Sequence, residues 1–184
     1  VTKECAISSS AILAMSFPQT VKNKLGKESY EQACKSFYQT SSLSEALIAK
    51  QDVDGAVSAM HDVTEGGVLG AVYEMAIASG NGVEIDNNAI PIGENIKGIC
   101  DLFGIDPRFS IGAGSMVIAV EKSQSAALVQ KLAGQNIQAS IIGKFTSKES
   151  GYKLIQNEQS IELPYHATDA YWNAFFTSQN KGWK

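Results

Sequence analysis

The sequence predicts an α/β (α+β layered) fold, in which a mixed β-sheet is covered by helices. Short apolar runs alternate with helical segments through the middle of the chain, and a hairpin is predicted near its end. With 184 residues, the folded chain can bury about 70% of the surface that it would expose unfolded. No internal repeat or linker interrupts it, so we predict one domain over residues 1–176 and a polar, frayed tail over residues 177–184.

The first third of the chain is predicted to be helical. Apolar spacing indicates a helix over Ser9–Leu25 that breaks at Pro18, because proline has no backbone N–H to donate. Ser29 begins a capping box ahead of a helix over Ser29–Gln39, and a shorter helix over Ser44–Lys50 follows.

Two strand–helix transitions are predicted next. Val53–Met60 is a short apolar run between turn residues, which is typical of a buried strand. In the helix that follows, Asp62 is expected to act as the N-cap with Glu65 at the third position, and Gly80 is expected to end it. The buried stripe of this helix is expected to consist of Val68, Leu69, Val72, Met75 and Ala76. After the helix, the apolar run Val83–Asp86 predicts another strand.

The second half predicts a further series of alternating elements. It begins with a helix that is amphipathic and ends at Gly104. The later elements are a strand over Ser115–Val120, a helix over Ser123–Leu132 capped by Gly134, a strand over Ile137–Phe145, and a hairpin of Tyr152–Ile155 and Ser160–Leu163 around Asn157-Glu158.

Composition excludes several classes of function. The formal net charge is −4, and no Lys/Arg cluster could neutralise a row of phosphates, so we expect no nucleic-acid partner. The longest apolar runs, such as Met116–Val120, are too short for a bilayer, so we expect a cytoplasmic protein without a membrane partner. Cys5, Cys34 and Cys100 are widely spaced, which predicts buried thiols and no metal site, with a reactive or regulatory cysteine as the alternative.

The most informative segment runs from Met60 to Gly70, where a strand passes into a glycine-rich helix start. The first amides of a helix have no intrahelical partner and attract anions, and Gly66 and Gly67 would let a ligand approach the backbone. An alternative is that the glycines only permit close helix–sheet packing. His61 is likewise either a catalytic residue or a hydrogen-bonded structural histidine.

Charge narrows the ligand that this segment could accept. Asp62 and Glu65 would repel a bare phosphate. Any phosphate bound there should therefore arrive with Mg²⁺, or with a lysine from another part of the protein.

A second glycine-rich turn lies before the strand that begins at Ser115. Gly112 and Gly114 precede a strand rather than a helix, which excludes a dinucleotide-binding fingerprint. Either a tight turn or a ligand-facing loop fits this pattern.

Several motifs together resemble the C-terminal domain of the aminoimidazole ribonucleotide (AIR) synthetase-related superfamily. Their order and spacing match over about Thr2–Leu163, and the resemblance is closest to relatives of the hydrogenase expression/formation type. Because the chain begins with Val1 rather than Met, we expect it to be a fragment of a longer protein. The motifs are Met60–Gly70, Val83–Asp86, Ile90–Ile92, Leu102–Pro107 and Gly114–Val120.

The resemblance implies an ATP-dependent enzyme that phosphorylates an amide-type oxygen of a small molecule or a protein tail. In such proteins an N-terminal domain carries the Mg²⁺-binding acids and most nucleotide contacts and builds the homodimer. Applied to this sequence, the resemblance assigns catalytic roles to His61 and Asp62. It assigns nucleotide or phosphate binding to Thr64, Glu65, Gly66, Gly67, Gly112, Gly114 and Ser115.

Two features limit this expectation. The hydrogenase maturation relatives act on a C-terminal cysteine, whereas this chain ends Ser178–Lys184 without one. A non-catalytic relative that serves as an assembly or regulatory module is therefore the alternative. Without its N-terminal domain, the fragment alone is expected to be inactive and to bind ATP weakly or not at all.

Overall fold

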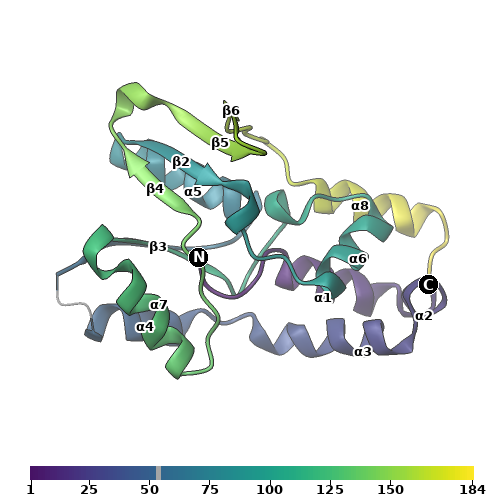
Figure 1. Cartoon of the computed structure of the whole chain (residues 1–184). Coiled ribbons are helices and arrows are strands. Elements are labelled where there is room, and N and C mark those ends of the chain that lie inside the picture. The colour runs from purple at the N-terminus through teal and green to yellow at the C-terminus, as the bar shows by residue number, and fades with distance from the viewer. Residues whose placement is uncertain (53–54) are drawn as a thin grey trace.

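The N-terminal third forms a group of helices, as the sequence predicts. The computed structural model describes residues 1–52 and 55–184. The first helices are α1 (Ile7–Ser16), α2 (Pro18–Leu25), α3 (Lys27–Ser36), a 3₁₀ turn over Phe37–Gln39 and α4 (Leu43–Asp52). They line the lower side of the molecule in Figure 1. The predicted break at Pro18 is confirmed, because this residue begins α2.

The predicted capping box at Ser29 is wrong. Gly26, at φ +92°, precedes α3, and no side chain caps this helix. Ser29 instead donates a hydrogen bond to the side-chain oxygen of Asn95, in a helix further along the chain. The spacing of Ser29 and Gln32 was therefore a chance match inside a helix that begins two residues earlier.

The strands form two sheets. β1 (Val57–Asp62) pairs antiparallel with β3 (Met116–Val120). The other sheet is mixed, since β2 runs parallel to β5 while its remaining pairs are antiparallel. Its order is β4 (Gly143–Thr146), β2 (Gly82–Asp86), β5 (Tyr152–Gln156) and β6 (Gln159–Glu162). The predicted α/β layering with a mixed sheet is confirmed.

The first predicted strand differs from its expected burial. Most residues of β1 are exposed, because the sheet that contains it has two strands and covers little of the core. Val53 and Asp54, at the start of the predicted strand, lie outside the described residues.

Helix α5 (Gly67–Ser79) joins the two sheets. It contacts β1 and β3 of one sheet and β2 of the other, and all five residues of its predicted apolar stripe are buried. Gly80 ends it in the left-handed conformation at φ +68°, as predicted. The amphipathic helix α6 (Glu94–Phe103) also ends at a left-handed glycine, Gly104.

Two boundaries in the second half differ from prediction. Helix α7 (Ser125–Gly134) includes Gly134, and its C-cap is Gln135. The strand expected from Ile137 begins only at Gly143, while Ala139 makes an isolated bridge to Thr2. The segment between them therefore pairs with the N-terminus of the chain, which its own composition does not reveal.

The C-terminal residues pack against the N-terminal helices. Helix α8 (Ala170–Asn180) extends past residue 177, and the Trp183 ring lies edge-on to Phe103 at 5.2 Å between centroids and to Phe17 at 6.4 Å. This differs from the frayed tail that the polar composition suggested, because one aromatic side chain finds a partly buried site there.

Two of the three cysteines are buried, as predicted. Burial raises the pKa of the Cys5 thiol well above its ordinary range and that of Cys100 to about 12. Both thiols therefore remain protonated and unreactive at neutral pH. Cys34 is partly exposed.

The predicted hairpin turn generates a stability test. Asn157 and Glu158 both have positive φ, at 50° and 64°, as a type I′ turn requires, and glycine is preferred at the second position. Glu158→Gly should raise the free energy of unfolding by about 0.5–1 kcal/mol, since the strain of a left-handed side chain exceeds the added entropy of the unfolded chain. Urea denaturation measures this.

The control is Glu162→Gly, which removes an exposed side chain from strand β6. That substitution should lower stability, because glycine weakens a strand. Equal destabilisation by both substitutions would contradict the turn geometry.

Candidate functional site

The turn between β1 and α5 holds the first group of predicted site residues. Val63 is buried and donates its backbone N–H to the carbonyl of Ser115 at 3.0 Å. Gly66 lies in the left-handed conformation, at φ +80°, immediately before α5. Asp62, Thr64 and Glu65 are exposed along this turn, so their oxygens are accessible to a ligand.

Asp62 does not cap α5. It is the last residue of β1, and the N-cap of α5 is Gly66, without a side-chain cap bond. The predicted cap is therefore wrong, because the chain needs four further residues to turn from the strand into the helix.

His61 is half-buried and held from both sides of its ring. Its Nδ1 lies 2.6 Å from the carbonyl oxygen of Asp62, and its Nε2 lies 2.9 Å from a carboxylate oxygen of Glu74. Both neighbours are acceptors, whereas a neutral imidazole can donate to only one of them. The contacts at both ring nitrogens fix the orientation of the imidazole at the edge of the exposed turn.

The amides at the start of α5 are not open to a ligand as expected. Gly66 N–H donates to Asp169 Oδ2 at 2.9 Å, and Gly67 N–H donates to the carbonyl of Thr64 at 3.2 Å. The expectation of free amides facing a phosphate is therefore wrong for both glycines. A carboxylate from the C-terminal part of the chain already supplies the negative charge that this helix end favours.

Gly67 is required for packing. It has φ +65°, and a Cβ atom there would lie 2.5 Å from the Arg108 carbonyl oxygen and 2.8 Å from the Ser110 nitrogen. The backbone of residues 108–110 thus lies directly on the start of α5. The glycine thus permits close packing, as the alternative explanation expected, but the helix packs here against the 3₁₀ turn at Pro107–Phe109 rather than against a sheet.

Residues 106–110 are fixed by an ion pair. Asp106 accepts the Arg108 backbone N–H at 2.9 Å, and the Arg108 guanidinium donates to both oxygens of the same carboxylate. Burial opposes ionisation of Asp106, but the hydrogen bonds and charge of Arg108 outweigh it and lower its pKa. This pair holds the chain in the bend that presses on Gly67.

The second glycine-rich turn is also buried. Gly112 donates its N–H to the carbonyl of Thr64 at 3.3 Å, and a Cβ on it would collide with Val63. Gly114, at φ +111°, lies against the backbone of Gln39, and Ser115 is fully buried. The expectation that Gly112, Gly114 and Ser115 face a ligand is therefore wrong, and this turn is a packing element.

The structure brings the two predicted segments into contact, but only some of their residues lie on the surface and the others are buried. The carbonyl of Thr64 accepts from both Gly67 and Gly112, so the two turns touch. Asp62, Thr64, Glu65 and part of His61 form the outer surface of this junction. Gly67, Gly112, Gly114 and Ser115 form its buried inner side.

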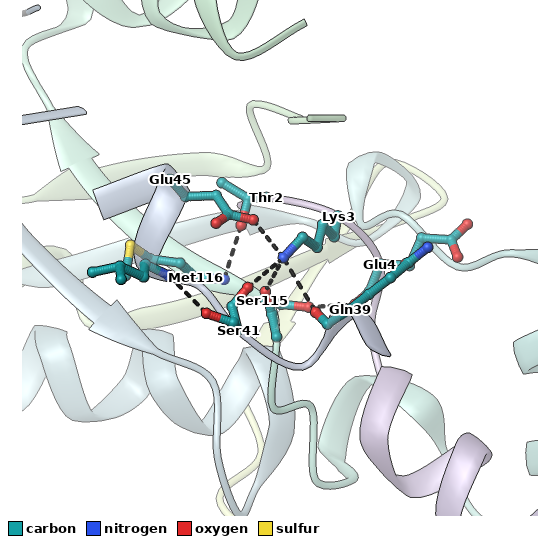
Figure 2. A network of polar contacts seen from close by, with 10 residues as sticks. Thr2, Lys3, Glu4, Gln39, Ser41, Glu45, Ser115 and Met116 are labelled. Atoms are coloured by element: carbon teal, nitrogen blue, oxygen red, sulfur yellow. Dashed lines mark hydrogen bonds and ion pairs between the residues drawn. The ribbon is translucent and has the colours of Figure 1, made fainter. Parts of the chain in front are cut away.

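A partly buried lysine, Lys3, organises the inner side (Figure 2). Lys3 Nζ donates to the carbonyls of Ser41 at 2.7 Å, Gly114 at 3.0 Å and Gln39 at 3.2 Å. It also lies 2.6 Å from Glu45 Oε1. Glu45 Oε1 accepts no hydrogen bond of good geometry. Its contact with the Lys3 ammonium is therefore an ion pair. Lys3 therefore joins the N-terminal segment, α4 and the Gly114 turn.

Sequence reasoning missed Lys3, Glu45 and Asp169. The position of a single lysine or glutamate in a sequence does not indicate that the residue forms a buried ion pair. Asp169 precedes an apolar helical stretch, and it indeed caps α8 by accepting the Tyr171 N–H at 2.9 Å. That cap was predictable from sequence, but its second bond to Gly66 was not.

The rest of the molecule adds no metal centre to this site. Within residues 1–52 and 55–184, no three His, Cys, Asp or Glu side chains lie close enough to hold a metal ion. No helix in this part of the chain is long and apolar enough to cross a membrane. A cavity of about 810 Å³, lined largely by apolar residues of β2, β3 and α7, lies elsewhere and includes none of the predicted site residues.

Fold and site together define an α/β domain with a rigid, glycine-packed junction that carries an exposed, acidic strand–helix turn. The chain belongs to the family of AIR synthase related proteins, as their C-terminal domain, which it matches over residues 1–154.

Among curated proteins, the chain is 33% identical over 120 residues to the carbamoyl dehydratase HypE of Escherichia coli. It is also 33% identical over 114 residues to a putative hydrogenase expression/formation protein of Methanocaldococcus jannaschii. These alignments cover 62% and 59% of this chain, but only 35% and 33% of the relatives. The chain thus spans about a third of their length.

Solved structures show the same fold. The hydrogenase maturation protein HypE of E. coli superposes with a TM-score of 0.57 at 27% identity, covering 69% of this chain and 41% of that one. A thiamine-monophosphate kinase from Stenotrophomonas maltophilia gives a TM-score of 0.61 at 16% identity, covering 88% of this chain and 50% of that one. The same fold therefore occurs in two proteins whose names give different activities.

The packing at Gly67 predicts a matched pair of substitutions. Gly67→Ala should lower the free energy of unfolding by about 2–4 kcal/mol, because the new methyl group meets backbone and the residue must hold a positive φ. Gly70→Ala lies three residues further in the same helix, where the nearest atom would be 3.6 Å away. This control should be neutral, or stabilising by up to about 1 kcal/mol. Equal effects in thermal denaturation would refute the close contact.

The Lys3 network predicts a coupling. Lys3→Met should cost about 3–5 kcal/mol of stability, because Glu45, which is 1% exposed, keeps a buried charge without its partner. The double variant Lys3→Met/Glu45→Leu should be more stable than Lys3→Met alone, since no uncompensated charge remains. Urea denaturation of both variants tests this. A loss below about 1 kcal/mol for Lys3→Met would show that the pair is solvated.

Proposed function

We propose that this chain is the C-terminal domain of an ATP-dependent enzyme that phosphorylates an amide-type oxygen. The match to the AIR synthase related family over residues 1–154 is the observation that carries this proposal. A relative of the same fold is described as the hydrogenase maturation protein HypE in complex with ATP, and another is named a carbamoyl dehydratase. The substrate would be a small molecule or a protein tail.

The exposed turn would contribute charge rather than amides. The carboxylates of Asp62 and Glu65 and the hydroxyl of Thr64 are oxygen ligands of the kind that Mg²⁺ prefers. They would contribute ligands to the metal of a Mg·ATP complex and would repel its phosphates without it. A bound Mg²⁺ would supply positive charge that stabilises the transferring phosphoryl group. The remaining ligands would come from another domain of the protein, which would also build the homodimer.

His61 and Asp62 would act next to the reacting groups. His61 is already oriented by Glu74 and by the carbonyl of Asp62, so it could hold a proton at a defined position at the edge of the turn. Gly66, Gly67 and the buried Gly112–Ser115 turn would support this surface from below. Their proposed part is to hold the turn in place, since their amides and side chains contact protein.

A second function has an observation in its favour. Asp169 already provides the anion at the start of α5, which suits a relative that keeps the fold without binding a nucleotide. In that case the chain would be an assembly or regulatory module, and the structure described as a HypE–HypF complex gives a relative with a protein partner. ATP turnover by the full-length protein discriminates between the two.

The incomplete site predicts weak nucleotide binding. Two or three charge-assisted hydrogen bonds at about 1.5–3 kcal/mol each would be largely offset by an association cost of about 4–15 kcal/mol. Isothermal titration calorimetry of the 184-residue chain with Mg·ATP should therefore give a Kd of about 1 mM or weaker. A micromolar Kd would contradict the incompleteness of the site.

The full-length protein provides the complementary experiment. Asp62→Asn and Glu65→Gln should each lower its ATP turnover at least about tenfold, whereas Glu149→Gln, an exposed carboxylate outside the turn, should not. An inactive full-length protein, or equal effects of all three substitutions, would favour the assembly module.

A further inference from the structure

Helix α8 carries two aromatic side chains that do not belong to the core. Trp172 is 42% exposed and Phe176 is 53% exposed. Their rings stack one turn apart, with centroids 6.5 Å apart and planes at 21°. On the opposite face of the same helix, Tyr171 and Ala174 are buried. Trp172 and Phe176 therefore form an aromatic ledge that faces outward.

A carboxylate lies directly beside this ledge. The indole N–H of Trp172 donates to Glu65 Oε1 at 3.3 Å, which joins α8 to the exposed β1–α5 turn. The negative charge of Glu65 also acts on Asp169, so two carboxylates lie close together here. A cation placed at Glu65 would relieve their repulsion.

Within residues 1–52 and 55–184, no such cation is seen at Glu65. Among the described residues, no lysine or arginine forms an ion pair with Glu65. Arg108 is held by Asp106, and Lys181 lies over the Trp183 ring at 5.9 Å. The aromatic ledge and its carboxylate thus present the two features that bind a guanidinium or ammonium group, without an internal partner.

We propose that the aromatic ledge of Trp172 and Phe176, together with Glu65, binds an arginine- or lysine-bearing segment of a partner protein. A guanidinium lies flat on the indole face and donates an N–H to Glu65. The aromatic rings supply apolar contact at little entropic cost, which is why tryptophan and arginine dominate interface energetics. The proposed function also uses Glu65, for the metal of a Mg·ATP complex, so the peptide is tested without nucleotide or Mg²⁺ and the outcome of one proposal does not decide the other.

The two tryptophans provide an internal comparison. In ¹H–¹⁵N NMR spectra, the pentapeptide Gly-Arg-Gly-Arg-Gly should shift the Trp172 indole resonance and leave that of Trp183, which packs on Phe17 and Phe103, in place. In the control peptide, citrulline replaces each arginine and keeps the shape of its side chain without the positive charge. The control peptide should bind at least about fivefold more weakly, and added salt should weaken the arginine peptide.

Variants separate the contribution of each group. Glu65→Gln should weaken the arginine peptide about two- to fivefold, and Trp172→Leu should abolish the shift of the Gly66 amide, which reports on the same turn. Glu158→Gln removes an exposed carboxylate from the distant hairpin and should change nothing. Equal binding of the citrulline peptide, unchanged affinity in Glu65→Gln, or equal shifts of both indoles would each overturn the proposal.

Discussion

The close contact of two backbones at Gly67 is the constraint on which the rest of this domain depends. Residues 108–110 lie on the first turn of α5 at a distance that leaves no room for a side chain. The Asp106–Arg108 pair fixes the bend on one side of the contact, and the carbonyl of Thr64 accepts from both turns at its centre. Because α5 contacts both sheets, this contact sets their relative position.

Lys3 places the remaining segments around that junction. One ammonium group is shared by Glu45, by two carbonyls of the 39–41 segment and by the carbonyl of Gly114. Because the Glu45 carboxylate is buried, separating these segments would leave its charge without a partner. The inner side of the junction is thus fixed by charge and backbone packing together, while its outer side is free to carry functional groups.

Local sequence patterns predicted those features of the fold that depend only on residues a few positions apart. The stripe of α5, the left-handed glycines at 80 and 104, and the hairpin at Asn157-Glu158 follow from periodicity and turn chemistry within a few positions. The site could be predicted only in part. Whether the Gly66 amide is free depends on Asp169, more than a hundred positions away, and the buried hydroxyl of Ser115 donates to the carbonyl of Glu4, at the other end of the chain.

The occupied start of α5 decides how a phosphate could approach. Asp169 accepts from Gly66 and also caps α8, so a phosphate that displaced it would remove acceptors from two helices, at about 0.5–2 kcal/mol each. An approach through a cation on Asp62 and Glu65 leaves both helix ends intact. The same charge argument applies to the aromatic ledge, where no described lysine or arginine pairs with Glu65. Whatever binds the outer surface of this domain should therefore present positive charge to it, whether as a metal ion or as a basic side chain.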